Sequence, residues 1–134
     1  MAEPLFLTLA EVIELHADQI KRYGGQDSVR DFGLLESALA QPEASFAGEW
    51  LHPTLYDMAA AYAYHLCQNR PFIDGNKRTA LACALAFLEL SGLSVRDPKG
   101  LLKDAMLSIA SGHMSKAEFA QLLQRLPRAK ARTS

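Results

Sequence analysis

The stretch from residue 79 to residue 90 is apolar except for Thr79 and Glu89, so a helix formed there has no polar face. Gly75 precedes the stretch and Gly92 follows it, at positions where glycine commonly marks a helix boundary. The stretch is shorter than the ~20 residues that a membrane-spanning helix needs. A helix that is apolar on all sides is stable in water only when other elements surround it. We therefore predict a buried central helix around which the rest of the chain packs.

Helix start and stop signals divide the rest of the chain. Thr8 with Glu11, and Ser115 with Glu118, have the spacing of a capping box, in which the two residues satisfy each other's backbone N–H groups at a helix start. The predicted helices, capping residues included, cover about residues 8–23, 31–41, 54–69, 75–90, 97–112 and 115–126. The fold class is all-α. We expect one compact domain over residues 1–127 and a basic, disordered tail over residues 128–134.

Strand signals are nearly absent from the sequence. Only residues 93–95 have the composition of a short strand. Residues 43–53 show no hydrophobic period, and we expect them to form a loop or short turns. Phe46 and Trp50 are large apolar side chains within that loop, so we expect it to pack as a flap.

Composition narrows the class of protein further. A chain of 134 residues, 49% of them apolar, is long enough for one domain that folds without disulfides or a structural metal. The net charge of −1 gives no indication of a nucleic-acid or membrane partner. Cys67 and Cys83 lie in apolar runs, as buried thiols do in the reducing cytoplasm. The first residues lack the basic region of a signal peptide, so we expect a cytoplasmic protein.

One polar segment, residues 69–79, interrupts the helices directly before the apolar helix. A helix start carries unpaired N–H groups and a partial positive charge, and Gly75 allows a ligand to approach that backbone. Lys77 and Arg78 add two cations suited to phosphate, and Asp74 is a carboxylate of the kind that Mg²⁺ prefers. These residues predict a nucleotide phosphate site. The alternative is a polar loop in which Asp74 only caps the helix and the cations are solvated.

The segment resembles the signature of the Fic/Doc family, and residues 74–80, Asp-Gly-Asn-Lys-Arg-Thr-Ala, are similar to its Doc (death-on-curing) branch. Residues 15–18, 22–25 and 30–38 also resemble that branch, so the likeness covers nearly the whole chain. It implies a small helical domain in which the motif loop leads into a central helix. It also implies the toxin of a type II toxin–antitoxin system. Such a toxin uses ATP and Mg²⁺ to phosphorylate a threonine of elongation factor Tu, which stops translation, and a cognate antitoxin binds it.

The resemblance also implies a role for each residue of the motif. Asp74 would be the Mg²⁺ ligand and Phe72 the apolar anchor of the loop. The anion hole would consist of Gly75, Asn76 and Lys77. Arg78 would hold phosphate charge in the transition state.

Lys77 bears on which group is transferred. Members of the family that transfer AMP usually carry a small glycine there, and the Doc branch carries lysine. A bulky cation favours a nucleotide pose with the terminal phosphoryl group facing the acceptor. Kinase activity is therefore the leading expectation and AMP transfer (AMPylation) the alternative. A module that only binds an antitoxin or a nucleotide is a third possibility. DNA binding is not expected, because residues 76–78 do not make a recognition face.

Arg70 departs from the family pattern, which begins with a histidine that takes the proton of the attacking hydroxyl. A guanidinium stays protonated and has no acceptor lone pair, so it cannot act as a general base. Two interpretations follow. Arg70 is either an inactivating change in an active toxin or the native residue of a pseudoenzyme that binds without turnover.

The four histidines are not expected to replace that base. His65 and His16 are predicted to be core residues, and His52 and His113 to be surface residues. An antitoxin that folds a disordered tail onto the toxin needs a groove, for which residues 46, 50 and 51 are the apolar candidates.

Overall fold

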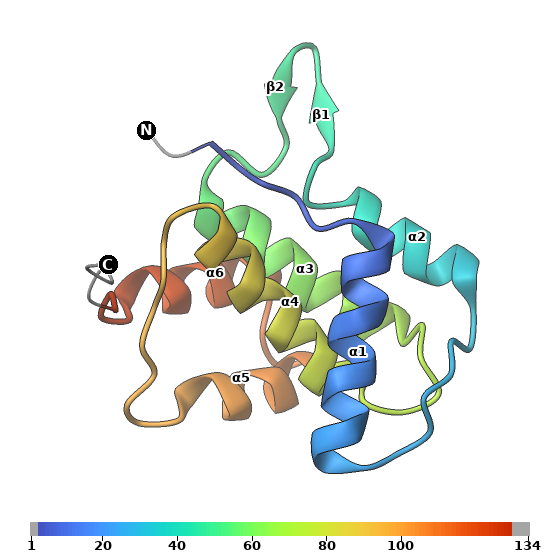
Figure 1. The fold of residues 1–134 in the computed structure, drawn as a ribbon. Helices are drawn as coiled ribbons and strands as arrows, with labels where there is room; N and C mark the ends of the chain where they lie inside the picture. Colours follow the sequence, from blue (N-terminus) through green and yellow to red (C-terminus); the bar gives the residue numbers. More distant parts are fainter. Residues whose placement is uncertain (1–2, 130–134) are drawn as a thin grey trace, which may run out of the picture.

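The computed structural model describes residues 3–129, which form six α-helices and one short β-hairpin (Figure 1). The elements in chain order are α1 (Leu9–Tyr23), α2 (Phe32–Ala40), β1 (Ser45–Phe46), β2 (Glu49–Trp50), α3 (Leu55–Asn69), α4 (Asn76–Leu90), α5 (Leu101–Ala110) and α6 (Lys116–Arg125). The helical fold predicted from the sequence is confirmed. In this part of the chain no helix is long and apolar enough to cross a membrane.

The apolar helix α4 lies at the centre, as predicted, with α3 along its length (Figure 1). Small side chains line both helices where they meet, and these are buried: Ala59, Ala60, Ala63, Ala80, Cys83 and Ala84. Short side chains let two helices approach closely, so α3 and α4 form the core pair. α1 packs on α4, α2 and α6 pack on α3, and α5 packs on both α3 and α4. Both cysteines are buried, as expected.

The capping residues that the sequence predicted begin their helices. Thr8 with Glu11 and Ser115 with Glu118 form complete capping boxes, at the starts of α1 and α6. Thr54 begins α3 in the same way, together with Asp57. Each box satisfies backbone N–H groups that a helix start otherwise leaves unpaired.

The predicted N-cap of the fifth helix, Asp97, is wrong by three residues. α5 begins at Leu101, and Gly100 is its N-cap with a φ of 67°. Residues 97–100 form a turn in which the Gly100 N–H donates to the Asp97 carbonyl oxygen (3.2 Å). The Asp97 carboxylate still accepts from the N–H groups of Leu101 and Leu102, at 2.8 Å each. Asp97 therefore caps the helix from a position outside it.

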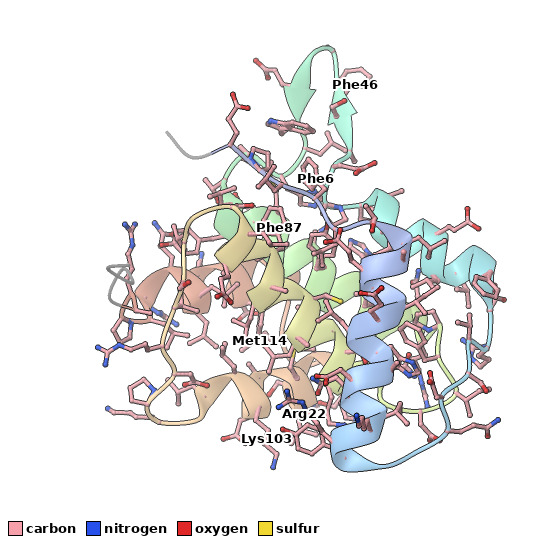
Figure 2. The ribbon with its side chains drawn as sticks, in the orientation of Figure 1. Phe6, Arg22, Phe46, Phe87, Lys103 and Met114 are labelled. Atoms are coloured by element: carbon pink, nitrogen blue, oxygen red, sulfur yellow. The ribbon has the colours of Figure 1, made fainter. Side chains whose placement is uncertain are left out.

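The expectation of a packed loop over residues 43–53 is corrected. The segment carries an antiparallel hairpin, β1 with β2, that stands away from the helices (Figure 1). Ala47 and Gly48 occupy its turn with φ values of 52° and 81°, the two positive angles that a tight hairpin turn requires. The Phe46 side chain is 77% exposed. Figure 2 places Phe6 between the hairpin and α4, where its ring contacts Trp50 edge-on (5.4 Å) and stacks on Phe87 (5.6 Å).

The start of the predicted tail is paired with the segment that follows α4. Val95 and Arg128 form an isolated bridge, and the Ala129 N–H donates to the Ser94 carbonyl oxygen (3.0 Å). Residues 93–95 thus supply the little strand character expected of them. Residues 130–134 lie outside the described part of the chain.

The expected positions of the histidines hold for His16 and His113, whereas His65 and His52 depart from them. His16 is buried and His113 is exposed, as predicted, while His65 is half-buried between α3 and α6. His52 is buried rather than on the surface. The Lys116 ammonium lies 3.1 Å from the His65 Nε2. Burial, with help from Lys116 and His52, lowers the pKa of His65 from 6.5 to about 4.

Acid is expected to destabilise the packing of α6 on α3 through His65. In the unfolded chain this side chain is protonated below pH ~6.5, whereas in the folded chain it stays neutral down to about pH 4. The contribution of neutral His65 to the free energy of unfolding is therefore complete above pH 6.5 and is lost progressively as the pH falls toward 4. Between pH 7 and pH 4.5, Tm should fall by a few degrees more in the wild type than in His65→Gln. His113→Gln, at an exposed site, should behave like the wild type, and equal falls in all three proteins would contradict the assignment.

Candidate functional site

The polar segment singled out in the sequence forms the loop between α3 and α4, and residues 28–31 hold it in place. The Pro71 carbonyl oxygen accepts from the N–H groups of Arg30 (2.7 Å) and Asp31 (3.1 Å). The Ile73 N–H donates to the Ser28 carbonyl oxygen (3.0 Å). These bonds pair the loop with a segment 40 or more residues earlier in the chain and fix the conformation of its backbone.

Phe72 and Asn76 fix the centre of the loop. The Phe72 side chain is 1% exposed, so the burial expected of it is confirmed. The Phe72 N–H donates to the Asn76 side-chain oxygen, and the Asn76 side-chain NH₂ donates to the Phe72 carbonyl oxygen, at 2.9 Å each. The Asn76 side chain is therefore committed to the loop. Only its backbone N–H is left for the anion hole in which the sequence placed this residue.

The start of α4 has no side-chain cap from any of residues 3–129. Gly75 is the N-cap, with a φ of 79°. The N–H groups of Asn76, Lys77 and Arg78 occupy the first turn, where no intrahelical acceptor exists. A Cβ added to Gly75 would lie 3.2 Å from the Ile20 Cδ1, so a side chain is disfavoured here by space as well as by backbone angle. A helix start of this kind favours phosphate.

Asp74 does not cap the helix, so the capping role considered from the sequence is wrong. Its carboxylate instead accepts the Gln26 N–H through Oδ2 at 2.8 Å. That bond uses one oxygen and leaves the second for a ligand. In the described part of the chain no three His, Cys, Asp or Glu side chains group to hold a metal. The donor set fits Mg²⁺, which typically binds through one or two carboxylates, phosphate oxygens and water.

The predicted site residues divide between two adjoining hollows. A cavity of about 280 Å³ is lined by Cys67, Gln68, Arg70, Ile73, Asp74, Gly75, Asn76, Lys77 and Ala110. A groove of about 580 Å³ begins on the other side of Lys77 and runs between α1, α4 and α5. Lys77 lines both. The cavity therefore brings together Asp74, the helix start and position 70, which the family pattern assigns to the base.

Arg78 lies in the groove and not in the cavity. Its guanidinium lies over the Tyr23 ring at 5.2 Å and donates to the Gly24 carbonyl oxygen at 3.2 Å. The phosphate contact expected of this side chain thus requires it to leave the end of α1. Its backbone N–H, in contrast, already belongs to the helix start.

Arg70 ends α3 in a left-handed conformation, with a φ of 49°. Arg30 donates to its carbonyl oxygen through Nε (2.8 Å) and to that of Asn69 through Nη2 (3.0 Å), which holds this conformation. The exposed Arg70 side chain lines the cavity. Burial raises the pKa of the neighbouring Cys67 thiol, while the charges of Lys77 and Arg70 oppose that shift. Both cations therefore lie close enough to the cavity wall to act on Cys67.

Several residues that build the site could not be predicted from the sequence. Cys67, Gln68 and Ala110 line the cavity, and Arg30 shapes the loop from the α1–α2 connection. His16 was predicted only as a core histidine, yet it contacts the loop: its ring lies 3.8 Å from the Phe72 ring. No local pattern signals such contacts, because their partners are far apart in the chain.

The fold and the site define a helical domain with an uncapped helix start beside one carboxylate. The chain belongs to the Fic/DOC family, whose sequence pattern matches residues 6–88. Over 116 residues it is 36% identical to the protein kinase doc of Escherichia phage P1, covering 87% of this chain and 90% of that protein. It is 45% identical over 73 residues to the toxin Doc of Mycolicibacterium smegmatis, covering 54% of this chain and 56% of that toxin. The matched part thus spans just over half the length of the mycobacterial relative.

Proposed function

We propose that the chain is a Doc-like toxin whose cavity binds ATP with Mg²⁺ and whose present form does not transfer phosphate. The observation that carries the proposal is the uncapped start of α4, which lies beside Lys77 and the Asp74 carboxylate in one cavity. Two relatives are named a toxin and a protein kinase, which supports the same function.

Each group of the cavity has a defined task in this proposal. The N–H groups of the first turn of α4 bind phosphate oxygens, and Lys77 neutralises charge at the cavity mouth. Asp74 holds Mg²⁺, which when bound neutralises phosphate charge and orients the nucleotide. The acceptor is a hydroxyl of a protein, for which the family resemblance names a threonine of elongation factor Tu.

Arg70 accounts for the missing turnover. It occupies the place from which a base would take the proton of the acceptor hydroxyl, and a guanidinium has no lone pair for that proton. Its charge adds to that of Lys77, so the cavity remains suited to phosphate. Binding and transfer are therefore separated in this chain.

The groove beside the cavity suits the antitoxin. Leu81, Leu85, Met106 and Leu107 form its apolar floor, while Lys77, Arg78 and Lys103 supply positive charge. An amphipathic segment with acidic residues would complement this lining. Figure 2 shows Lys103 and Arg22 at the same end of the molecule. None of residues 46, 50 and 51, the candidates from the sequence, lines this groove.

Replacing Asp74 by Asn is expected to weaken Mg²⁺-dependent ATP binding by about tenfold or more. Asn keeps a side-chain oxygen that accepts the Gln26 N–H, so Tm should change little, but it loses the charge that binds the metal. Calorimetric titration of ATP with Mg²⁺ and with EDTA measures the effect. Asp104→Asn, at an exposed position on α5, is the matched control and should bind like the wild type. A large drop in Tm with unchanged ATP affinity would instead make Asp74 a structural residue.

A further inference from the structure

The connection between α1 and α2 covers Asp74 from the side of its carboxylate. The Gln26 N–H donates to the Asp74 Oδ2 at 2.8 Å. Gly25, with a φ of 113°, approaches so closely that an added Cβ would lie 3.0 Å from the Asp74 Cβ. That separation is tighter than most contacts of real Cβ atoms, so a side chain at position 25 would push Asp74 or the turn by a few tenths of an ångström. The two residues together hold the Asp74 side chain in one orientation.

His16 supports Asp74 from the opposite side, through the backbone. Its side chain is 1% exposed, and its Nε2 lies 2.8 Å from the Asp74 carbonyl oxygen. Because a carbonyl oxygen only accepts, Nε2 is the donor in this bond. The His16 ring also stacks on Phe72, with an angle of 6° between the ring planes. One buried side chain of α1 thus contacts the loop on both sides of Ile73.

We infer that His16, Gly25 and Gln26 are positioning residues that set the affinity of the site for Mg²⁺. None of the three lines the cavity, so they act through Asp74 and not on the nucleotide. They restrain its backbone and its carboxylate, and a restrained ligand loses less freedom when it binds a metal. Groups that hold a metal ligand in place commonly change metal affinity about 10–100-fold. The inference rests on the proposed function, because it requires Asp74 to be the metal ligand.

Gly25→Ala tests the contact at the surface of the molecule. The measured quantity is the ratio of ATP affinity with Mg²⁺ to ATP affinity with EDTA, together with Tm. The control is Gly112→Ala, since Gly112 also has a positive φ (81°) but its added Cβ would meet no atom within 4 Å. Both variants should lose a few degrees of Tm through backbone strain. Only Gly25→Ala should lower the ratio, by about tenfold. An unchanged ratio in Gly25→Ala, or an equal loss in Gly112→Ala, would overturn the inference.

His16→Leu and His16→Gln test the contact in the core. Both lose the stacked ring, but a glutamine side chain still presents an N–H that can reach the Asp74 carbonyl oxygen, whereas leucine presents none. The ratio should fall about tenfold in His16→Leu and be largely rescued in His16→Gln. A role in packing alone would lower Tm in both variants and leave the two ratios equal, which would overturn the inference for His16.

Measurements on the wild-type protein distinguish a failure of the proposed metal site from a failure of the positioning role alone. If ATP binds the wild type no better with Mg²⁺ than with EDTA, both the proposed metal site and the positioning role are wrong. If Mg²⁺ strengthens binding in the wild type and Asp74→Asn abolishes that gain, while Gly25→Ala and His16→Leu keep it, only the positioning role is wrong.

Discussion

Replacing Arg70 by His is expected to restore phosphoryl transfer, with a rate gain of about 10²–10⁴ from the regained general base. Position 70 lines the cavity together with Asp74 and the start of α4, so a histidine there reaches the space that the acceptor hydroxyl must occupy. The backbone accepts the change readily. At a φ of 49°, histidine is one of the residue types that tolerate the left-handed region well.

The restored protein is measured in two ways. Induced expression of Arg70→His should arrest growth, and co-expressed antitoxin should relieve the arrest. With purified elongation factor Tu, label from the γ-phosphate of ATP should appear on the factor and label from the α-phosphate should not. Label from the α-phosphate would mean AMP transfer and would contradict the kinase assignment.

The control for this variant is Arg70→Asn. Asparagine also suits a left-handed backbone and removes the cation, but it supplies no base. It should remain inactive and harmless, like the Arg70 form. Activity in Arg70→Asn would show that the guanidinium blocks the site and that the base lies elsewhere. If Arg70→His is also harmless and inactive, the pseudoenzyme interpretation holds.

Replacing Phe72 by Ala is expected to lower the free energy of unfolding by roughly 3–5 kcal/mol. The ring is fully enclosed and stacks on His16, so truncation leaves a cavity and removes the stacking partner of a buried polar side chain. Urea denaturation monitored by circular dichroism measures the change. ATP affinity should fall as well, because the loop loses its anchor beside the start of α4.

Phe46→Ala is the matched control for the loss of a phenylalanine. Its side chain stands in solvent on the hairpin, so the free energy of unfolding should change by no more than about 0.5 kcal/mol. A cost below about 1 kcal/mol for Phe72→Ala would mean that the loop is held chiefly by its backbone bonds to residues 28–31.

The helices were predictable because their signals are local. A capping box such as Thr8 with Glu11 acts between residues three apart. The apolar side chains of α4 are by themselves enough to predict that this helix is buried. Local signals fail where a turn is unusual. Ala47 stands at a position of the hairpin turn that Asn, Asp or Gly normally occupies. The turn over residues 97–100 delays the start of α5, although Asp97 still caps that helix.

The burial of particular side chains was less predictable. Phe72 was placed correctly because its position within the motif favoured an anchor. His52 was placed wrongly because a histidine near a proline has no local feature that distinguishes a covered position from an exposed one. Phe46 was expected to pack, yet the hairpin that carries it extends beyond the helices.

The helical class, the central helix and the chemical groups of the motif loop were predictable from the sequence, since each follows from residues within a few positions of one another. How those groups are held depends on contacts between distant parts of the chain. Gln26 meets Asp74 across 48 residues, and His16 meets the Asp74 backbone across 58. Such pairs form only when α1 packs against α4, because packing and not chain neighbourhood brings them within hydrogen-bond distance. The same packing separates Arg78, which turns toward Tyr23, from Lys77, its neighbour in the chain, which lines the cavity.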